Sequence, residues 1–210
     1  MVKVLLFDFW GTLMENGVWS PTRQVKEILG IPILFSEYVV RFEKTMMTSD
    51  FPELRMAFEN VAQEFKVDCS ERQMEMLIGM WNKSWMLARP YPETTEMLAE
   101  LQKKHRLVLV SNTDRFSINN VLNKFGMKKY FEKVFCSYEL GLIKTDSEFL
   151  PKVLAELGAT AEECVMIGDS LESDMLPAQK AGIKAVMMDR RNSRQFGLKI
   201  RNLNELESVL

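Results

Sequence analysis

Apolar residues gather in five short runs along the 210-residue chain, and each run has the length and the β-branched content of a buried strand. The runs are Val2 to Phe7, Leu107 to Val110, Lys133 to Cys136, Cys164 to Ile167 and Lys184 to Met188. Helical patterns separate most of them. Because continuous apolar strands that alternate with helices are typical of parallel sheets covered on both faces, the pattern predicts an open, doubly wound α/β core.

The gap between the first two runs is about a hundred residues, whereas a single crossover needs only about a dozen. Apolar positions in this gap recur at spacings of three and four, which predicts amphipathic helices. The patterns cover Pro52 to Val67 and Glu71 to Ala88 and, more weakly, Ser20 to Leu29 and Ser36 to Thr48. We therefore predict an inserted α-helical bundle at residues 16–89, between core segments 1–15 and 90–210.

The first apolar run ends on a carboxylate. A buried strand that ends on an acid places it at the carboxyl edge of the sheet, where open α/β folds bind ligands. Asp8 holds this position, and Gly11 lets the following backbone approach a substrate closely. Asp8 is therefore the candidate nucleophile.

Three further polar segments follow predicted strands, so we expect them at the same edge. Ser111 and Asn112 can donate a hydroxyl and backbone amides to an anionic oxygen, although this segment is equally suited to cap the next helix. Lys144 offers a cation that could neutralise a nucleophile and an anionic substrate together. Asp169 and Asp174 form an acid–turn–acid arrangement that has few structural reasons to exist without a cation.

Composition narrows the class of ligand. The formal charge of −2 comes from interspersed signs with no basic run, so the chain lacks the electrostatic footprint of a protein that binds nucleic acid or an anionic membrane surface. A small polar metabolite is the better expectation. No apolar stretch has the length of a membrane span, and the N-terminus reaches its first acid too early for a secretory signal, so we expect a cytoplasmic protein.

The number and positions of the histidine and cysteine residues argue against several other kinds of catalytic or metal site. His105 is the only histidine and lies in a polar turn, which argues against Ser-His-Asp and Cys-His catalysis. Cys69, Cys136 and Cys164 match no metal or redox spacing. We expect these cysteines to be buried or half-buried small apolar residues.

In these four segments the chain resembles the haloacid dehalogenase (HAD) superfamily. Asp8-Phe9-Trp10-Gly11-Thr12 is similar to the first motif, Asp-x-Asp-x-Thr, and Gly168-Asp169 with Asp174 is similar to the fourth. Ser111 and Lys144 match the second and third. The resemblance implies a Rossmann-like core with a helical lid, and a Mg²⁺-dependent phosphatase that acts on a small phosphorylated metabolite through an aspartyl-phosphate.

The resemblance also implies roles for individual residues. Asp8 would attack phosphorus and, with the backbone carbonyl of Trp10 and with Asp169, would ligate Mg²⁺. Asp174 would orient a metal-bound water or hold Lys144. The phosphoryl group would be bound by residues of the first three motifs, namely Gly11, Thr12, Ser111, Asn112 and Lys144.

Trp10 departs from the family pattern, which has an acid/base aspartate there. An indole N–H does not ionise usefully, so it can neither protonate a leaving alkoxide nor activate water. The substitution predicts weak turnover of alkyl phosphates and a smaller loss for aryl or acyl phosphates, whose leaving groups need little protonation. Glu15 and Glu172 are candidates to supply the missing function.

Other functions remain open. A 2-haloacid dehalogenase has an aromatic residue where Trp10 stands, but an ionised Asp169 without a cation would repel both Asp8 and an anionic haloacid. A phosphonate hydrolase would need a lysine partner that the sequence does not identify. A catalytically weak binding protein that uses the same pocket or the lid surface is a further alternative. The oligomeric state is not indicated.

The predicted bundle carries a stripe of large apolar residues, Met74, Ile78, Trp81 and Trp85. Its helical spacing predicts that the stripe packs inside the bundle. If it faced the site instead, it would favour an apolar or aromatic leaving group. Trp19 is an equally open candidate for a substrate wall, and we expect hinges near Asn16 to Gly17 and Arg89 to Pro90.

Overall fold

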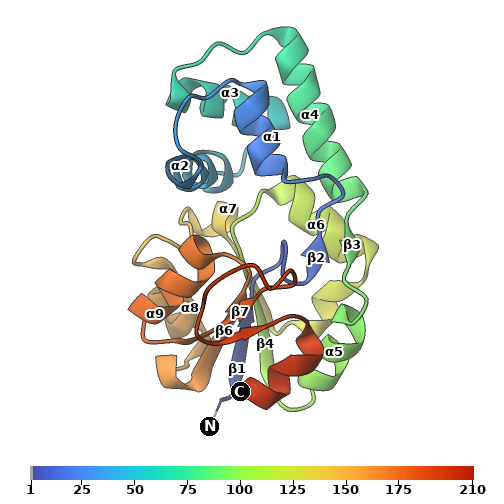
Figure 1. The fold of residues 1–210 in the computed structure, drawn as a ribbon, viewed down its shortest axis with the longest axis vertical. Helices are drawn as coiled ribbons and strands as arrows, with labels where there is room; N and C mark the ends of the chain where they lie inside the picture. The colour runs from blue at the N-terminus through green and yellow to red at the C-terminus, as the bar shows by residue number, and fades with distance from the viewer. Residues whose placement is uncertain (1) are drawn as a thin grey trace.

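A parallel sheet of six strands forms the lower half of the molecule in the computed structural model, which describes residues 2–210 (Figure 1). The strand order is β5-β4-β1-β6-β7-β8. The strands are β1 (Val4–Phe7), β4 (Arg106–Ser111), β5 (Lys133–Cys136), β6 (Cys164–Gly168), β7 (Lys184–Met188) and β8 (Lys199–Ile200). The sheet confirms the predicted doubly wound α/β fold.

The central strand β1 pairs with β4 on one side and with β6 on the other. Phe7 is in register with Leu109 and with Ile167, so the three strands end at nearly the same level. The strand order reverses at β1, which makes its carboxyl end the switch point of the sheet, where doubly wound folds open a crevice.

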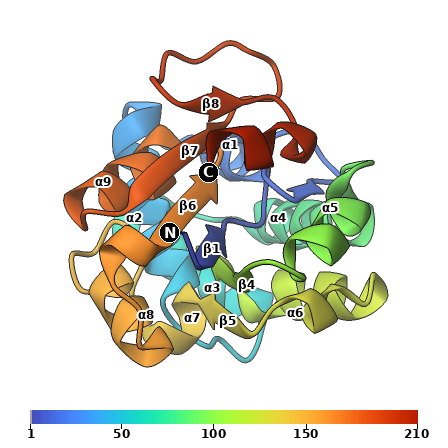
Figure 2. The same ribbon diagram turned by 90° about the horizontal axis from the view of Figure 1, so that it is seen from below.

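Helices cover both faces of the sheet (Figures 1 and 2). Side chains of β1 alternate between two apolar clusters, because successive residues of a strand point to opposite faces. One cluster is covered by α5 (Thr94–Leu101), α6 (Arg115–Lys124) and the C-terminal turn η4 (Leu203–Val209), and the other by α8 (Phe149–Leu157) and α9 (Leu176–Lys180). The remaining short elements are α7 (Ser137–Leu140), η1 (Met127–Tyr130), η2 (Ala161–Glu163) and η3 (Leu171–Met175).

Four helices lie above the carboxyl edge of the sheet (Figure 1). We call them the helical module: α1 (Pro21–Ile28), α2 (Phe35–Met47), α3 (Leu54–Phe65) and α4 (Glu71–Met86). The module has its own apolar core, in which Tyr38, Phe42 and Phe58 are fully buried. Ser70 and Gln73 form a reciprocal capping box at the start of α4, which explains why this helix begins where the sequence predicts.

The chain enters and leaves the module through a short two-stranded ribbon that the sequence analysis missed. In it β2 (Met14–Glu15) pairs antiparallel with β3 (Arg89–Pro90). These strands, like β8, have only two residues each, so they show no alternation for a pattern to reveal. The domain boundaries at residues 15–16 and 89–90 stay a prediction, as do the hinges, and residue 1 lies outside the described part of the chain.

The apolar stripe of α4 is divided between two clusters. Met74 and Trp81 are buried in the core of the module, and Ile78 packs against that core, as predicted. Trp85 packs instead against the core of the sheet, since α4 runs down to that level. Trp19 is exposed.

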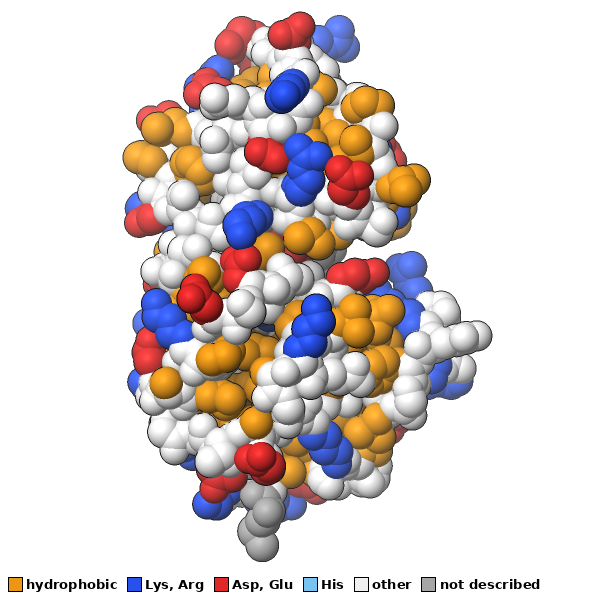
Figure 3. All heavy atoms as spheres, turned by 90° about the vertical axis from the view of Figure 1, so that its left-hand side faces the viewer, with side chains coloured by type: hydrophobic (Ala, Val, Ile, Leu, Met, Phe, Trp, Pro, Cys, Tyr) orange, Lys and Arg blue, Asp and Glu red, His pale blue; other side chains and the backbone are white. Residues whose placement is uncertain are grey.

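Other sequence expectations can be compared with the fold. Cys136 and Cys164 are buried and Cys69 is half-buried, which confirms that part of the analysis. The turn residue His105 is partly buried rather than fully solvated. Within residues 2–210, no helix is both long and apolar enough to cross a membrane. Acidic and basic side chains are interspersed on the face seen in Figure 3.

Candidate active site

The segments singled out in the sequence meet at the carboxyl edge of the sheet. Asp8 follows β1, Ser111 ends β4 and Asp169 follows β6. Lys144 comes from the loop after α7 and reaches the same place, where its Nζ lies 2.7 Å from Asp8 Oδ1. The strand register therefore gathers residues that are as much as 161 positions apart, because parallel strands end on one side of the sheet.

Lys144 is held between two carboxylates. Its ammonium group donates to Asp8 Oδ1 and, at 2.5 Å, to Asp174 Oδ1. The lysine, Asp8 and Asp174 are all buried. Burial by itself lowers the pKa of Lys144, but the charges of Asp174 and Asp8 outweigh burial and hold that pKa above its ordinary value. Lys144 is thus a permanent positive charge beside Asp8.

Asp169 completes a group of three acids. One carboxylate oxygen from each of Asp8, Asp169 and Asp174 can lie within 4.8 Å of the others, an arrangement that could hold a metal ion. Burial, opposed by Lys144, raises the pKa of Asp8, and burial together with its acidic neighbours raises the pKa of Asp169. The exposed side chain of Arg194 is the one described cation that forms an ion pair with Asp169, at 3.7 Å. The acids therefore exceed the fixed positive charge, and a hard divalent cation suits these oxygen donors.

Gly11 is required by the position of Asp169. Its φ is +81°, in the left-handed region, and a Cβ at this position would overlap the Asp169 carboxylate. Gly168 likewise has no space for a Cβ, since the Asp174 carboxylate occupies it. The two glycines let the backbone pass directly beside the acids.

Asp174 lies in the irregular turn η3, a single turn of π-helix. Such turns widen the helix by one residue and are frequent at functional sites. Ser170 caps the turn, its side chain accepting from the backbone N–H of Ser173, and its own N–H donates to Asp174 Oδ2. The sequence pattern indicated the acid but not this geometry.

Two hydroxyl groups of the candidate site differ in their partners. Thr12 Oγ1 donates to Asp8 Oδ2 at 3.0 Å, so its hydroxyl faces the candidate nucleophile. Ser111 is fully buried, and its Oγ has no hydrogen-bond partner among the described residues. An orphaned hydroxyl is costly in a protein interior, and an anionic ligand oxygen would satisfy it.

The side chain of Asn112 bridges the sheet core and the helical module. Its Oδ1 accepts from the backbone N–H of Lys144 at 2.9 Å, and its Nδ2 donates to Glu43 Oε2 at 2.8 Å. Both ends of the amide are therefore engaged within the protein. The sequence analysis grouped Asn112 with the phosphoryl ligands and did not single out Glu43, which is one of two acids on α2 and belongs to no motif.

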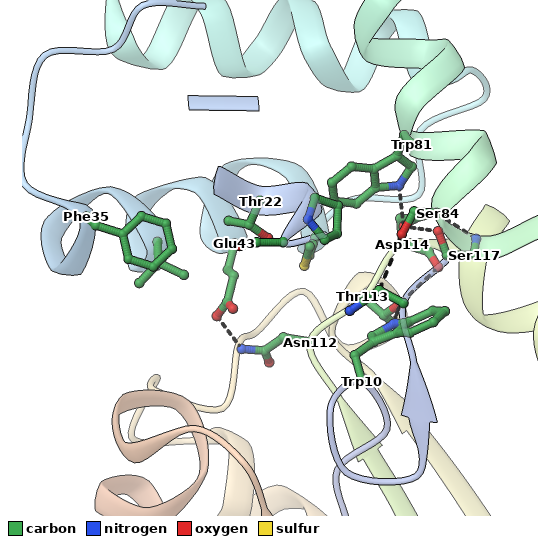
Figure 4. A pocket seen from close by; sticks show the side chains of 15 residues that line it. Trp10, Thr22, Phe35, Glu43, Trp81, Ser84, Asn112, Thr113, Asp114 and Ser117 are labelled. Atoms are coloured by element: carbon green, nitrogen blue, oxygen red, sulfur yellow. Dashed lines mark hydrogen bonds between the residues drawn. The ribbon is translucent and has the colours of Figure 1, made fainter. Parts of the chain in front are cut away.

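A cavity of about 230 Å³ lies between the module and the sheet edge (Figure 4). Core residues such as Trp10, Asn112 and Thr113 form its floor, and Glu43 and Trp81 face it from the module. Trp10 is fixed by an indole N–H that donates to Thr113 Oγ1 at 3.3 Å. Glu15 and Glu172 are exposed and do not line this cavity, so the structure does not bring these two acids to Trp10.

The fold and this arrangement of residues agree with the comparison to known families. Residues 2–182 match the model of the haloacid dehalogenase-like hydrolases, and the chain belongs to that family. It is 30% identical to glyceraldehyde 3-phosphate phosphatase of Methanothermobacter thermautotrophicus over 198 residues, which cover 90% of this chain and 86% of that protein.

Two solved structures are similar in fold. One is a 2-haloacid dehalogenase from Pseudomonas syringae, with a TM-score of 0.66, 19% identity and coverage of 100% and 98% of the two chains. The other is a HAD phosphatase from Thermococcus onnurineus, with a TM-score of 0.65, 23% identity and coverage of 99% and 97%. At such identities the likeness concerns the fold alone, and the fold occurs with both activities.

Proposed function

We propose that this chain is a Mg²⁺-dependent phosphatase that hydrolyses phosphoric monoesters of small metabolites through an aspartyl-phosphate on Asp8. The observation that carries the proposal is the group of three acids around Lys144. A dehalogenase would have to keep Asp169 beside Asp8 without a cation, whereas a metal-dependent phosphatase uses both acids. The 30% identity to a named phosphatase supports the same conclusion.

The residues take the following roles in the proposal. Asp8 attacks phosphorus, while Lys144 and the unpaired Ser111 hydroxyl bind phosphoryl oxygens. Asp8, the carbonyl of Trp10 and Asp169 would hold Mg²⁺, and Asp174 holds Lys144 in place. Bound Mg²⁺ supplies charge neutralisation for the attacking carboxylate and for the phosphoryl group. Thr12 orients Asp8 through its hydrogen bond, and Gly11 leaves room for Asp169.

The cavity favours a substrate whose leaving group carries no negative charge. Among the described residues that line it there is no lysine or arginine, while Glu43 and Asp114 are acidic. A haloacid carboxylate or a second phosphate would therefore meet no cation among these lining residues. Aromatic walls such as Trp10, Phe35 and Trp81 suit a leaving group that is partly apolar.

The test is phosphate release from an aryl phosphate, measured with Mg²⁺, with EDTA and with the variant Asp8→Asn. We expect Mg²⁺-dependent release that the variant loses. Asp68→Asn, at an exposed position of the module, is the matched control and should keep full activity. Halide release from 2-chloropropionate that is insensitive to EDTA would establish a dehalogenase instead, and inactivity in both assays would favour a binding protein.

A further inference from the structure

Glu43 is an acid of the helical module that faces the candidate active site. It lies on α2, and its carboxylate points toward Asn112 across the cavity (Figure 4). Its Oε2 accepts from Asn112 Nδ2 at 2.8 Å and from Ser173 Oγ at 3.1 Å. Asn112 directly follows Ser111, and Ser173 directly precedes Asp174. Glu43 is thus anchored to the neighbours of two residues of the site.

The two oxygens of this carboxyl group differ. Oε2 accepts two hydrogen bonds, whereas Oε1 makes none to any described residue. When the group is protonated, the proton therefore sits on Oε1, because Oε2 is occupied by two donors. The side chain lines the same cavity as Trp10, so Oε1 is the atom free to donate to a ligand there.

The surroundings of Glu43 favour a carboxyl group that can be protonated near neutral pH. Burial, partly offset by the hydrogen bond from Asn112 and by the charge of Lys144, raises its pKa to about 7. The charge of Asp174 pushes the pKa of Glu43 upward. A general acid works best when its pKa lies near the working pH.

We propose that Glu43 is the general acid and base of the reaction and performs the task that Trp10 cannot perform. This inference rests on the proposed phosphatase function. The helical module then contributes a catalytic group and does more than cover the site.

The proton balance is complete with residues of this chain. As Asp8 Oδ bonds to phosphorus, the bond from phosphorus to the ester oxygen breaks, and that oxygen takes the proton of Glu43 to leave as an alcohol. The Glu43 carboxylate then takes a proton from the water whose oxygen attacks the aspartyl-phosphate. This step releases inorganic phosphate, restores the Asp8 carboxylate and leaves Glu43 protonated again.

The decisive experiment compares two substrates in the intact chain with Mg²⁺: 4-nitrophenyl phosphate, whose leaving group needs no proton, and 2-phenylethyl phosphate, whose alkoxide does. In the variant Glu43→Gln, the amide oxygen can accept the same two hydrogen bonds from Asn112 and Ser173. The amide group, however, has no acidic proton to transfer to the leaving group. We expect kcat/KM for the alkyl ester to fall by about a hundredfold or more and that for the aryl ester by less than about tenfold. Because kcat/KM covers only steps up to the aspartyl-phosphate, the second half-reaction does not affect the comparison.

The control variant is Lys44→Met. Lys44 follows Glu43 on α2, and its Nζ lies 2.8 Å from Asp146 Oδ1, so it makes a contact between module and core without facing the cavity. If Glu43 only helps to hold the module against the core, Glu43→Gln will behave like Lys44→Met. Each variant will then lower kcat/KM for the aryl ester and for the alkyl ester by the same factor. That result would overturn the inference.

A second measurement needs no variant. In the wild-type protein, kcat/KM for the alkyl ester should decline as the pH rises above about 7 relative to kcat/KM for the aryl ester. Parallel pH profiles for the two esters would overturn the inference and leave the phosphatase function standing. Failure of the wild-type protein on both esters would overturn the phosphatase function and this inference with it.

Discussion

Lys144 is the residue on which the candidate site depends most. It is 3% exposed and compensates two buried carboxylates, Asp8 and Asp174. The attraction within such a group offsets the cost of burying its charges only while every partner is present. The residue that would neutralise phosphoryl charge is therefore also one that the fold requires.

Replacing Lys144 by methionine should lower both stability and activity. Asp8 and Asp174 would remain buried without a partner, and we expect the free energy of unfolding to fall by about 3–5 kcal/mol. Urea denaturation in EDTA, with the slope compared to that of the wild type, measures this loss. Lys152→Met, on the exposed face of α8, is the control and should change stability little. A stable Lys144→Met protein would mean that the acids are protonated or solvated in the fold.

Substitution of Gly11 shows whether the position of the Asp169 carboxylate matters for metal binding. Gly11→Ala strains a backbone in the left-handed region and also displaces the Asp169 carboxylate. Gly126→Ala strains the same kind of backbone but displaces nothing, since its Cβ would meet open space. Both variants should lose about 1–2 kcal/mol of stability. Only Gly11→Ala should weaken Mg²⁺ binding, by about tenfold to a hundredfold. Calorimetric titration with Mg²⁺ measures the difference, and equal affinities would argue against Asp169 as a ligand.

At the scale of elements, the junction of α4 and α6 connects the module to the sheet core. The indole N–H of Trp81 on α4 donates to Asp114 Oδ2 at 3.0 Å. Asp114 is the N-cap of α6 and also accepts from the backbone N–H and the hydroxyl of Ser117. A helix of the module thus completes the cap of a helix of the core, and the stripe on α4 serves this junction as well as the bundle.

Trp81→Phe should weaken this junction. Phenylalanine keeps the aromatic packing against Phe42 and Phe58 but leaves the buried Asp114 with one donor fewer. We expect a loss of about 1–3 kcal/mol in the free energy of unfolding. In the control Trp85→Phe the lost bond is local, to Asn82 of the same helix, so the loss should be smaller. Urea denaturation of both variants makes the comparison, and equal losses would show that only ring size matters.

At the scale of the whole molecule, Glu43 couples the docking of the module to pH. In the folded protein its pKa is raised from 4.5 to about 7 by burial, with Lys144 and Asp174 as the charged neighbours. The folded state therefore holds this proton more tightly than the unfolded state does. The resulting stabilisation is complete below about pH 4.5 and is lost as the pH rises to about 7.

The free energy of unfolding of the wild type should depend on pH differently from that of Glu43→Gln when both are measured in EDTA. Between about pH 5 and about pH 8 the wild type should lose stability relative to the variant, which has no proton to release at this position. Unfolding free energies across that range measure the difference, and all other groups cancel because both proteins contain them. Parallel curves would show that Glu43 is solvated and has an ordinary pKa.

The local sequence was sufficient to predict the five longer strands of the sheet and the polar residues that follow them. Apolar runs and the polar residues at their ends are short-range features, and parallel pairing with β1 then brings Asp8, Ser111 and Asp169 to one edge. The amphipathic helices of the module were visible for the same reason. The two-residue strands β2, β3 and β8 were not predicted, because two residues are too few to show the alternation of apolar and polar positions that marks a strand.

The contacts across the cavity depended on the tertiary structure alone. Glu43 belongs to no motif and lies 69 residues from Asn112, so nothing in its local sequence distinguishes it from Glu37, the other acid of α2. Its place is decided by how the module docks on the sheet, and so is the hydrogen bond from Trp81 to Asp114. The contact that requires Gly11 to be glycine is decided within the core, where the turns after β1 and β6 bring Gly11 beside Asp169. Hydrophobic periodicity dictates which residues form elements, but it carries no information on which side chains of two separately packed cores face each other.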